Sequence, residues 1–264
     1  MFSVVFEVKP RPEAFDIYLG IAKELRPILE DIDGFIDDER FESSSKPGWI
    51  LSHSTWRDEK SVVRWRTTAK HHLAQERGRG EVFEDYSLRV GEIVSDTAPP
   101  AGLPIIEQRL DETETGRAKF VSLTEFEFAR IHLANVLEAF KIEQPGLIER
   151  DLFKSLSNKR KYAHVMSWDS RIGAERYTPE IPAEATVRHR IVRIVREYGM
   201  LDRQESPRYY PDVPAPAKCQ DNPFSAVPSS PSAQTLGTAH DPFSMATNSL
   251  TVWLRSRAPI APKR

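Results

Sequence analysis

The chain repeats part of its own sequence pattern about 112 residues further on, and this internal repeat limits the possible folds more than any other feature. Residues 34–38 (GFIDD) reappear in altered form at 146–150 (GLIER), and Trp56 reappears as Trp168 at the same offset. A repeat of this length indicates two copies of one structural unit within a single chain.

The first copy is predicted to run strand, helix, strand, strand, helix, strand. Apolar and β-branched residues predict the strands, and apolar residues three and four positions apart predict the helices. Asp58 is placed to cap the second helix. The predicted strands cover about 2–8, 35–43, 49–56 and 86–94, and the predicted helices about 13–31 and 59–76. This order is that of the ferredoxin-like split unit, β-α-β-β-α-β.

The second copy follows the same order with one loss. Its first strand is predicted at 119–126, its first helix at about 129–141 and its last strand at 188–198. The last strand matches the first copy at an offset of 101, so 11 residues are missing before it. Because Pro179 and Pro182 lie in this shortened stretch, we expect its second helix to be short or absent.

The sequence therefore divides into four segments: a first repeat at 1–97, a linker at 98–118, a diverged second repeat at 119–204 and a tail at 205–264. Ten of the 20 prolines fall in the tail, a composition typical of an irregular arm. Its one apolar cluster, 250–254 (LTVWL), is expected to dock on the rest of the chain.

Two ferredoxin-like repeats predict an α+β fold in which the chain supplies both halves of a barrel. The helices of each repeat cover one face of its sheet, so we expect the two bare faces to pack against each other. The resulting space between the sheets, apolar with a few polar groups, would be the default ligand cavity. Because only the first copy keeps its whole second-helix segment, the ligand is expected between that helix and the sheet of the first copy, or at the barrel end nearest to it.

Composition narrows the function to small-molecule chemistry. The 37 basic and 39 acidic residues leave a net charge of −2, which gives no basic field for nucleic acid or an anionic membrane. One cysteine, Cys219, excludes an intramolecular disulfide and a cysteine-based zinc site. No metal-ligand or phosphate-loop spacing occurs, so neither metal nor cofactor is expected. The absence of a signal peptide or a long apolar run predicts a cytoplasmic protein.

Several stretches of the first copy, within about 3–95, carry a family resemblance: LRPILEDIDGFIDDERFES, PGWILSHSTWRDE, VVRWRTTAKHHLAQERGR and VFEDYSLRVGEIV. In combination they resemble the antibiotic biosynthesis monooxygenase family, whose fold is the dimeric α+β barrel. The second copy is similar through EQPGLIERDLFKSL, HVMSWDS and RIVREYGMLDR. Some family members oxidise aromatic polyketides with dioxygen and no metal or flavin, and others bind and degrade haem. The resemblance implies a monomeric pseudo-dimer or a homodimer.

Trp65, His71 and His72 are the first candidates for chemistry, and all lie in the predicted second helix. The resemblance places the family's usual histidine at His71. A histidine there would accept a substrate proton, because its ordinary pKa lies near neutrality, while Trp65 would line the cavity. The alternative is that Trp65 is core and both histidines are solvated.

Tyr86 and Arg89 lie three positions apart in a predicted strand, so they face opposite sides of the sheet. Leu88 and Val90 share the face of Tyr86, which we expect the helices to cover. Arg89 is therefore the better candidate to face the cavity and hold an anion, unless it forms an ion pair between the sheets, for example with Glu7. His53 is a further candidate for substrate binding or for a structural role.

The sequence favours a cofactor-independent monooxygenase that acts on an electron-rich aromatic or polyketide-type molecule with dioxygen. The proton acceptor would be His71 or His72, the charge stabiliser Arg89 and the stacking residue Trp65. Haem degradation is disfavoured because the first strand has no Asn and His72 is too close to Trp65 for the haem-degrading pattern. Two alternatives use the same cavity: a cyclase, isomerase or decarboxylase of natural-product biosynthesis, and a non-catalytic ligand-binding (including haem-binding) protein.

Overall fold

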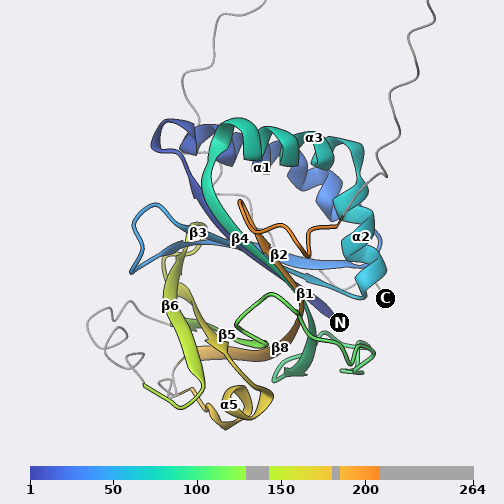
Figure 1. Ribbon diagram of the computed structural model, residues 1–264, viewed down its shortest axis with the longest axis vertical. Helices are drawn as coiled ribbons and strands as arrows, with labels where there is room; N and C mark the ends of the chain where they lie inside the picture. Colours follow the sequence, from blue (N-terminus) through green and yellow to red (C-terminus); the bar gives the residue numbers. More distant parts are fainter. Residues whose placement is uncertain (129–142, 180–184, 208–264) are drawn as a thin grey trace, which may run out of the picture. The chain divides into compact units, whose positions relative to one another are not determined.

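The computed structural model describes residues 1–128, 143–179 and 185–207, and Figure 1 shows the arrangement of their helices and strands. The first half contains β1 (Phe2–Pro10), η1 (Pro12–Ala14), α1 (Phe15–Glu30), β2 (Phe35–Ser43), β3 (Ile50–Trp56), α2 (Glu59–Thr67), α3 (Ala69–Arg77), η2 (Gly78–Val82) and β4 (Phe83–Asp96). The second half contains β5 (Phe120–Phe128), β6 (Leu147–Ser155), β7 (Lys161–Trp168), α5 (Arg171–Arg176) and β8 (Ala185–Gly199).

The eight strands form one closed barrel in the order β1-β3-β2-β6-β7-β5-β8-β4, and all pairs are antiparallel. Within each half the order is that of a ferredoxin-like sheet: β4-β1-β3-β2 and β8-β5-β7-β6. Two edge pairings, β2 with β6 and β4 with β8, join the halves. The predicted α+β class is therefore confirmed.

Matching positions of the two halves make matching local contacts. Gly34 and Gly146 both have positive φ angles, of 89° and 84°, which glycine adopts without strain. The carbonyl of Gly34 accepts a hydrogen bond from the Arg57 amide, and that of Gly146 accepts one from the Asp169 amide. The predicted Asp58 cap is confirmed, and Ser170 caps α5 in the same way. That the halves arose by duplication, and that the segments divide at 97, 118 and 204, stay predictions.

The interior of the barrel is filled with side chains, so the expected space between the sheets is not where the cavity lies. Alternate residues of each strand point inward and form one apolar cluster that draws on all eight strands. Its strand members are Val5, Phe41, Leu51, Ile93, Val121, Leu123, Phe153, Ala163, Val165, Val192 and Ile194.

The helices of the first half lie on the outer face of β1–β4, and α5 lies beside β5, β7 and β8 (Figure 1). The predicted single helix at 59–76 is wrong, because Thr68 is extended (ψ 127°) and separates α2 from α3. The hydroxyls of Thr67 and Thr68 donate to the carbonyls of Val63 and Arg64, which competes with continuation of the helix. The second helix of the second half is short, as predicted: α5 has six residues.

The helix predicted at 129–141 and the tail from 208 onward, including 250–254 and Cys219, lie outside the described residues. No helix in the described ranges is long and apolar enough to cross a membrane.

Candidate functional site

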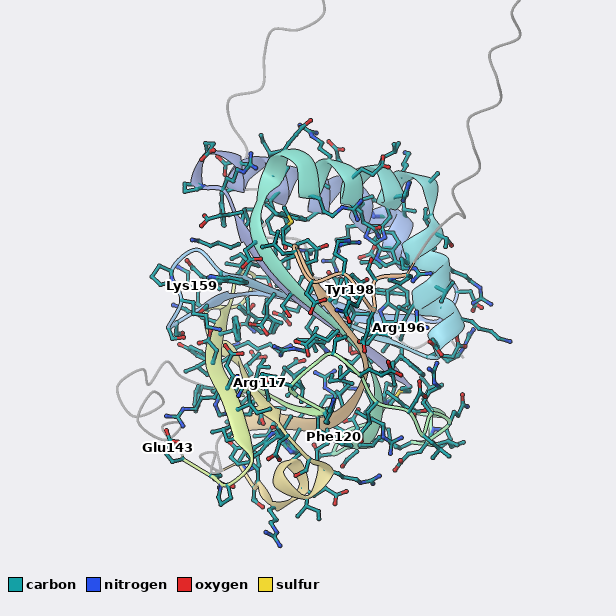
Figure 2. All side chains as sticks on the ribbon, in the orientation of Figure 1. Arg117, Phe120, Glu143, Lys159, Arg196 and Tyr198 are labelled. Atoms are coloured by element: carbon teal, nitrogen blue, oxygen red, sulfur yellow. The ribbon has the colours of Figure 1, made fainter. Side chains whose placement is uncertain are left out.

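A cavity of about 240 Å³ lies between the helices of the first half and the outer face of its sheet. Its walls are largely apolar. They come from α1, α2, α3 and strands β1, β2, β3, β4 and β8, and their apolar members include Val4, Phe6, Ile21, Leu25, Leu29, Val62, Phe83, Leu88, Val90 and Tyr198. Tyr198 is labelled in Figure 2. This volume is many times that needed for one water molecule, so an organic molecule fits the cavity.

Trp65 and His71 form a stacked pair in the cavity wall. Their ring centroids lie 4.0 Å apart with an angle of 15° between the planes, and His71 Nδ1 lies 3.0 Å from the Trp65 carbonyl oxygen. The break at Thr68 makes this possible, because it folds the start of α3 back onto the end of α2. His72 also lines the cavity, with Nε2 3.4 Å from Glu76 Oε1.

Burial lowers the pKa of His71 to about 4, although its hydrogen bond to the Trp65 carbonyl acts in the opposite direction. The imidazole is therefore neutral near pH 7 and able to accept a proton. Since its basicity is below that of free histidine, it suits substrate protons that are already acidic.

Five arginines line the cavity and only one acidic residue does. The arginines are Arg26, Arg40, Arg66, Arg79 and Arg203, and the acid is Asp38. Arg40 and Arg26 both lie against Asp38, at 3.1 and 3.5 Å. Arg203 instead donates to Ser206 Oγ and to the Tyr86 hydroxyl, which are uncharged. The lining therefore carries an excess of positive charge, which favours an anionic ligand.

Tyr18 and Arg40 bring two further polar groups into the lining. Tyr18, on α1, is 6% exposed. Its hydroxyl oxygen and Arg40 Nε are both buried, and neither makes a hydrogen bond of good geometry to a described group. Arg40 and Ser52 nevertheless lie close enough to the hydroxyl to act on its pKa. Ser52 lies directly opposite Arg40 in the β2–β3 pairing and also lines the cavity.

Arg89 does not line this cavity, which corrects its predicted placement beside the ligand. The prediction that the helices cover the face of Tyr86 is correct, but the cavity lies on that same face, so Tyr86 lines it. Arg89 points into the barrel, where its Nη1 lies 3.3 Å from Glu7 Oε1 and its Nε donates to Glu197 over 3.1 Å. Its Nη1 also reaches Ser167 on β7, across the barrel. The alternative of an ion pair with Glu7 is the one observed.

His53 also lies inside the barrel and away from the cavity. Its Nε2 lies 2.9 Å from Ser3 Oγ and its Nδ1 3.6 Å from Glu125 Oε1. Burial and the nearby Arg190 lower the pKa of His53 to about 3. Arg190 itself pairs with Glu125 and donates to Thr55. These contacts tie opposite walls of the barrel together.

Of the predicted site residues, Trp65, His71, His72 and Tyr86 meet at the cavity, whereas Arg89, Glu7 and His53 lie inside the barrel. Sequence reasoning missed Tyr18 and Arg40. The available signal was the face of β2: Asp38 and Arg40 alternate with inward residues such as Phe41, so they lie on the face that the helices cover. Among the described residues, no group of three or more His, Cys, Asp or Glu could hold a metal ion.

Comparison with known proteins gives matches over most of the chain. A family model for antibiotic biosynthesis monooxygenase matches residues 1–77. A protein from Pyricularia oryzae called jasmonate monooxygenase ABM is 42% identical over 219 residues, which are 80% of this chain and 99% of that protein. Rv0793 from Mycobacterium tuberculosis covers 34% of this chain and 90% of its own, with 17% identity and a TM-score of 0.31. An aldoxime dehydratase covers 73% of this chain and 80% of its own, with 10% identity and a TM-score of 0.49.

Proposed function

Because the chain belongs to the antibiotic biosynthesis monooxygenase family, we propose that it oxygenates a small, largely apolar molecule bound between its helices and its sheet. The observation that carries this proposal is the cavity itself, in which apolar walls meet the stacked Trp65–His71 pair and an excess of arginines. Trp65 offers a flat surface for a ring of the substrate.

The reaction proposed is one in which the substrate supplies the electrons. His71 or His72 accepts a proton from an acidic C–H or O–H bond, and the electron pair of that bond remains on the substrate as a resonance-stabilised anion. The anion transfers electrons to dioxygen and a C–O bond forms; the O–O bond then breaks as the remaining hydrogen of that carbon leaves as a proton. CH₂ + O₂ thereby becomes C=O + H₂O, which balances without an external reductant. The CH₂ group of an anthrone fits this chemistry directly, and a hydroquinone fits it through the CH₂ group of its keto tautomer.

The arginine excess extends the proposal to anionic substrates. The relative from Pyricularia oryzae has jasmonate in its name, and jasmonate is an organic anion. We therefore include jasmonate among the first ligands to test. Replacing one C–H bond by C–OH consumes two further electrons, so that reaction would require an added reductant such as NADPH or ascorbate.

The experiment is oxygen uptake by the purified full-length protein with an anthrone, a hydroquinone and jasmonate, each with and without NADPH or ascorbate. We expect uptake that depends on substrate and, with ¹⁸O₂, one labelled oxygen atom in the product. Trp65→Phe should slow the reaction, whereas Trp49→Phe, outside the cavity lining, serves as the matched control. Equal turnover without oxygen would indicate a cyclase, isomerase or decarboxylase instead, and binding without any turnover would indicate a ligand-binding protein.

A further inference from the structure

Two buried polar groups in the cavity, both able to donate a hydrogen bond, make none of good geometry within the described residues. One is the hydroxyl of Tyr18, and the other is the Nε–H of Arg40. They come from different elements, α1 and β2, and line the same cavity. A buried donor without an acceptor is costly, so the arrangement fits a ligand atom that accepts both hydrogen bonds.

The geometry points to Tyr18 and Arg40 as a subsite that binds a carbonyl or phenol oxygen of the substrate. This inference rests on the proposed function, because it places one atom of the proposed substrate in the same cavity. We call Tyr18 and Arg40 the oxygen subsite.

The charges around the oxygen subsite favour such an oxygen over a second carboxylate. Arg40 Nη1 donates to Asp38 Oδ2 over 3.1 Å, so a carboxylate already balances the guanidinium while its Nε–H remains available. Burial raises the pKa of Tyr18, although the neighbouring Arg40 and Ser52 act the other way. The hydroxyl therefore stays protonated at neutral pH and remains a donor.

The oxygen subsite also performs the task that the sequence assigned to Arg89. When a proton leaves the carbon next to a carbonyl, or leaves a phenol, the electron pair of the broken bond moves onto the oxygen. Two donors held in place by the fold stabilise that charge without reorganisation. This compensates for the weak basicity of His71, because stabilising the anion makes the substrate proton more acidic.

The test is equilibrium binding without oxygen, so no turnover is needed. The probes are 4-cyanophenol, which ionises to an oxyanion, and 4-cyanoanisole, which has the same ring with a methyl ether. Affinities come from calorimetry, and ionisation of the bound phenol comes from its ultraviolet difference spectrum. We expect the wild-type protein to lower the pKa of the bound phenol and to prefer the phenolate by roughly tenfold or more, the scale of a hydrogen bond to a charged group.

Tyr18→Phe and Arg40→Lys should each lose most of this preference while binding 4-cyanoanisole as before. Arg40→Lys keeps the positive charge beside Asp38, and Tyr18→Phe removes a hydroxyl that makes no hydrogen bond of good geometry, although Arg40 and Ser52 lie close to it. Neither variant should therefore lower the melting temperature by more than a few degrees. Tyr162→Phe is the matched control, because Tyr162 is equally buried but packs against Phe126 on the other half.

Retention of the phenolate preference in both variants, or equal loss of affinity for the two probes, would overturn the oxygen subsite. The proposed function would then still stand, since the cavity would bind aromatic ligands and oxygen uptake is measured separately. If the wild-type protein bound neither probe, both the oxygen subsite and the proposed aromatic site would be wrong.

Discussion

Replacing Arg89 by methionine should destabilise the barrel strongly, because Arg89 is the shared partner of the buried Glu7 carboxylate and the half-buried Glu197 carboxylate. Its side chain is 7% exposed, and it lies 3.3 Å from Glu7 and 3.1 Å from Glu197. Removing one partner of a buried ion pair costs about 3–5 kcal/mol. Lys46 also acts on Glu7, which favours the lower end of that range. At about 2–4 °C per kcal/mol for a domain of this size, the melting temperature should fall by roughly 6–12 °C.

The measurement is urea unfolding and calorimetry of Arg89→Met, with the double variant Arg89→Met/Glu7→Gln beside it. The double variant should recover part of the loss, because Glu7 then carries no charge to be left unpaired.

The loss of stability in Arg89→Met should also depend on pH. Burial already raises the pKa of Glu7, and loss of Arg89 raises it further. The folded variant then binds a proton on Glu7 at pH values where the unfolded chain does not. Its stability therefore falls as pH rises through the folded pKa, and the gap to wild type should narrow as pH is lowered toward about 5.

An Arg89→Met protein with the wild-type melting temperature but without ligand binding or turnover would refute this reasoning. It would show that Arg89 acts on the ligand, as first predicted from the sequence, and that the ion pairs inside the barrel contribute little.

Two further predictions concern the histidines. His71→Ala should weaken binding of aromatic ligands by up to about tenfold, the scale of one ring–ring contact. The melting temperature should change by no more than a few degrees. Unchanged ligand affinity, measured by calorimetry, would remove His71 from the site. The free energy of unfolding should fall as pH drops below about 6.5, because the unfolded chain binds protons there on His53, His71 and His164. In the folded protein the pKa values of these three groups are lowered to about 3, about 4 and about 3. Urea unfolding from pH 7 to about pH 4.5 tests this, and a flat profile would contradict it.

The strands and their faces follow from the sequence because period-2 alternation and turn glycines are local signals. The strand predicted at 35–43 coincides with β2, and Gly34 and Gly146 have the positive φ angles that their turns need. No local sequence pattern indicates which side of the sheet holds the cavity. That side depends on how completely side chains from eight strands fill the barrel, and ion pairs such as Arg190 with Glu125 contribute to that filling.

The same limit explains the errors in the candidate site. Opposite faces for Tyr86 and Arg89 were predictable, but the sequence offered both the helix-covered face and the space between the sheets as the place of the cavity. Tyr18 falls at a position of the apolar stripe of a predicted helix. That position does not indicate that its hydroxyl makes no hydrogen bond of good geometry. The break between α2 and α3 depends on two threonine hydroxyls bonding backward to carbonyls, which helix periodicity does not register.

The two edge pairings that close the barrel can form only after the ribosome has made the later strand of each pair. β4 ends at Asp96, and its partner β8 ends at Gly199. At about 5–20 residues per second, the intervening stretch takes roughly 5–20 s to translate. Throughout that interval β4 presents an unpaired edge, and β2 does so until its partner β6, which ends at Ser155, has been made. Other nascent chains can join these edges. Slower elongation over residues 97–199 should therefore lower the yield of folded protein through aggregation of the first half.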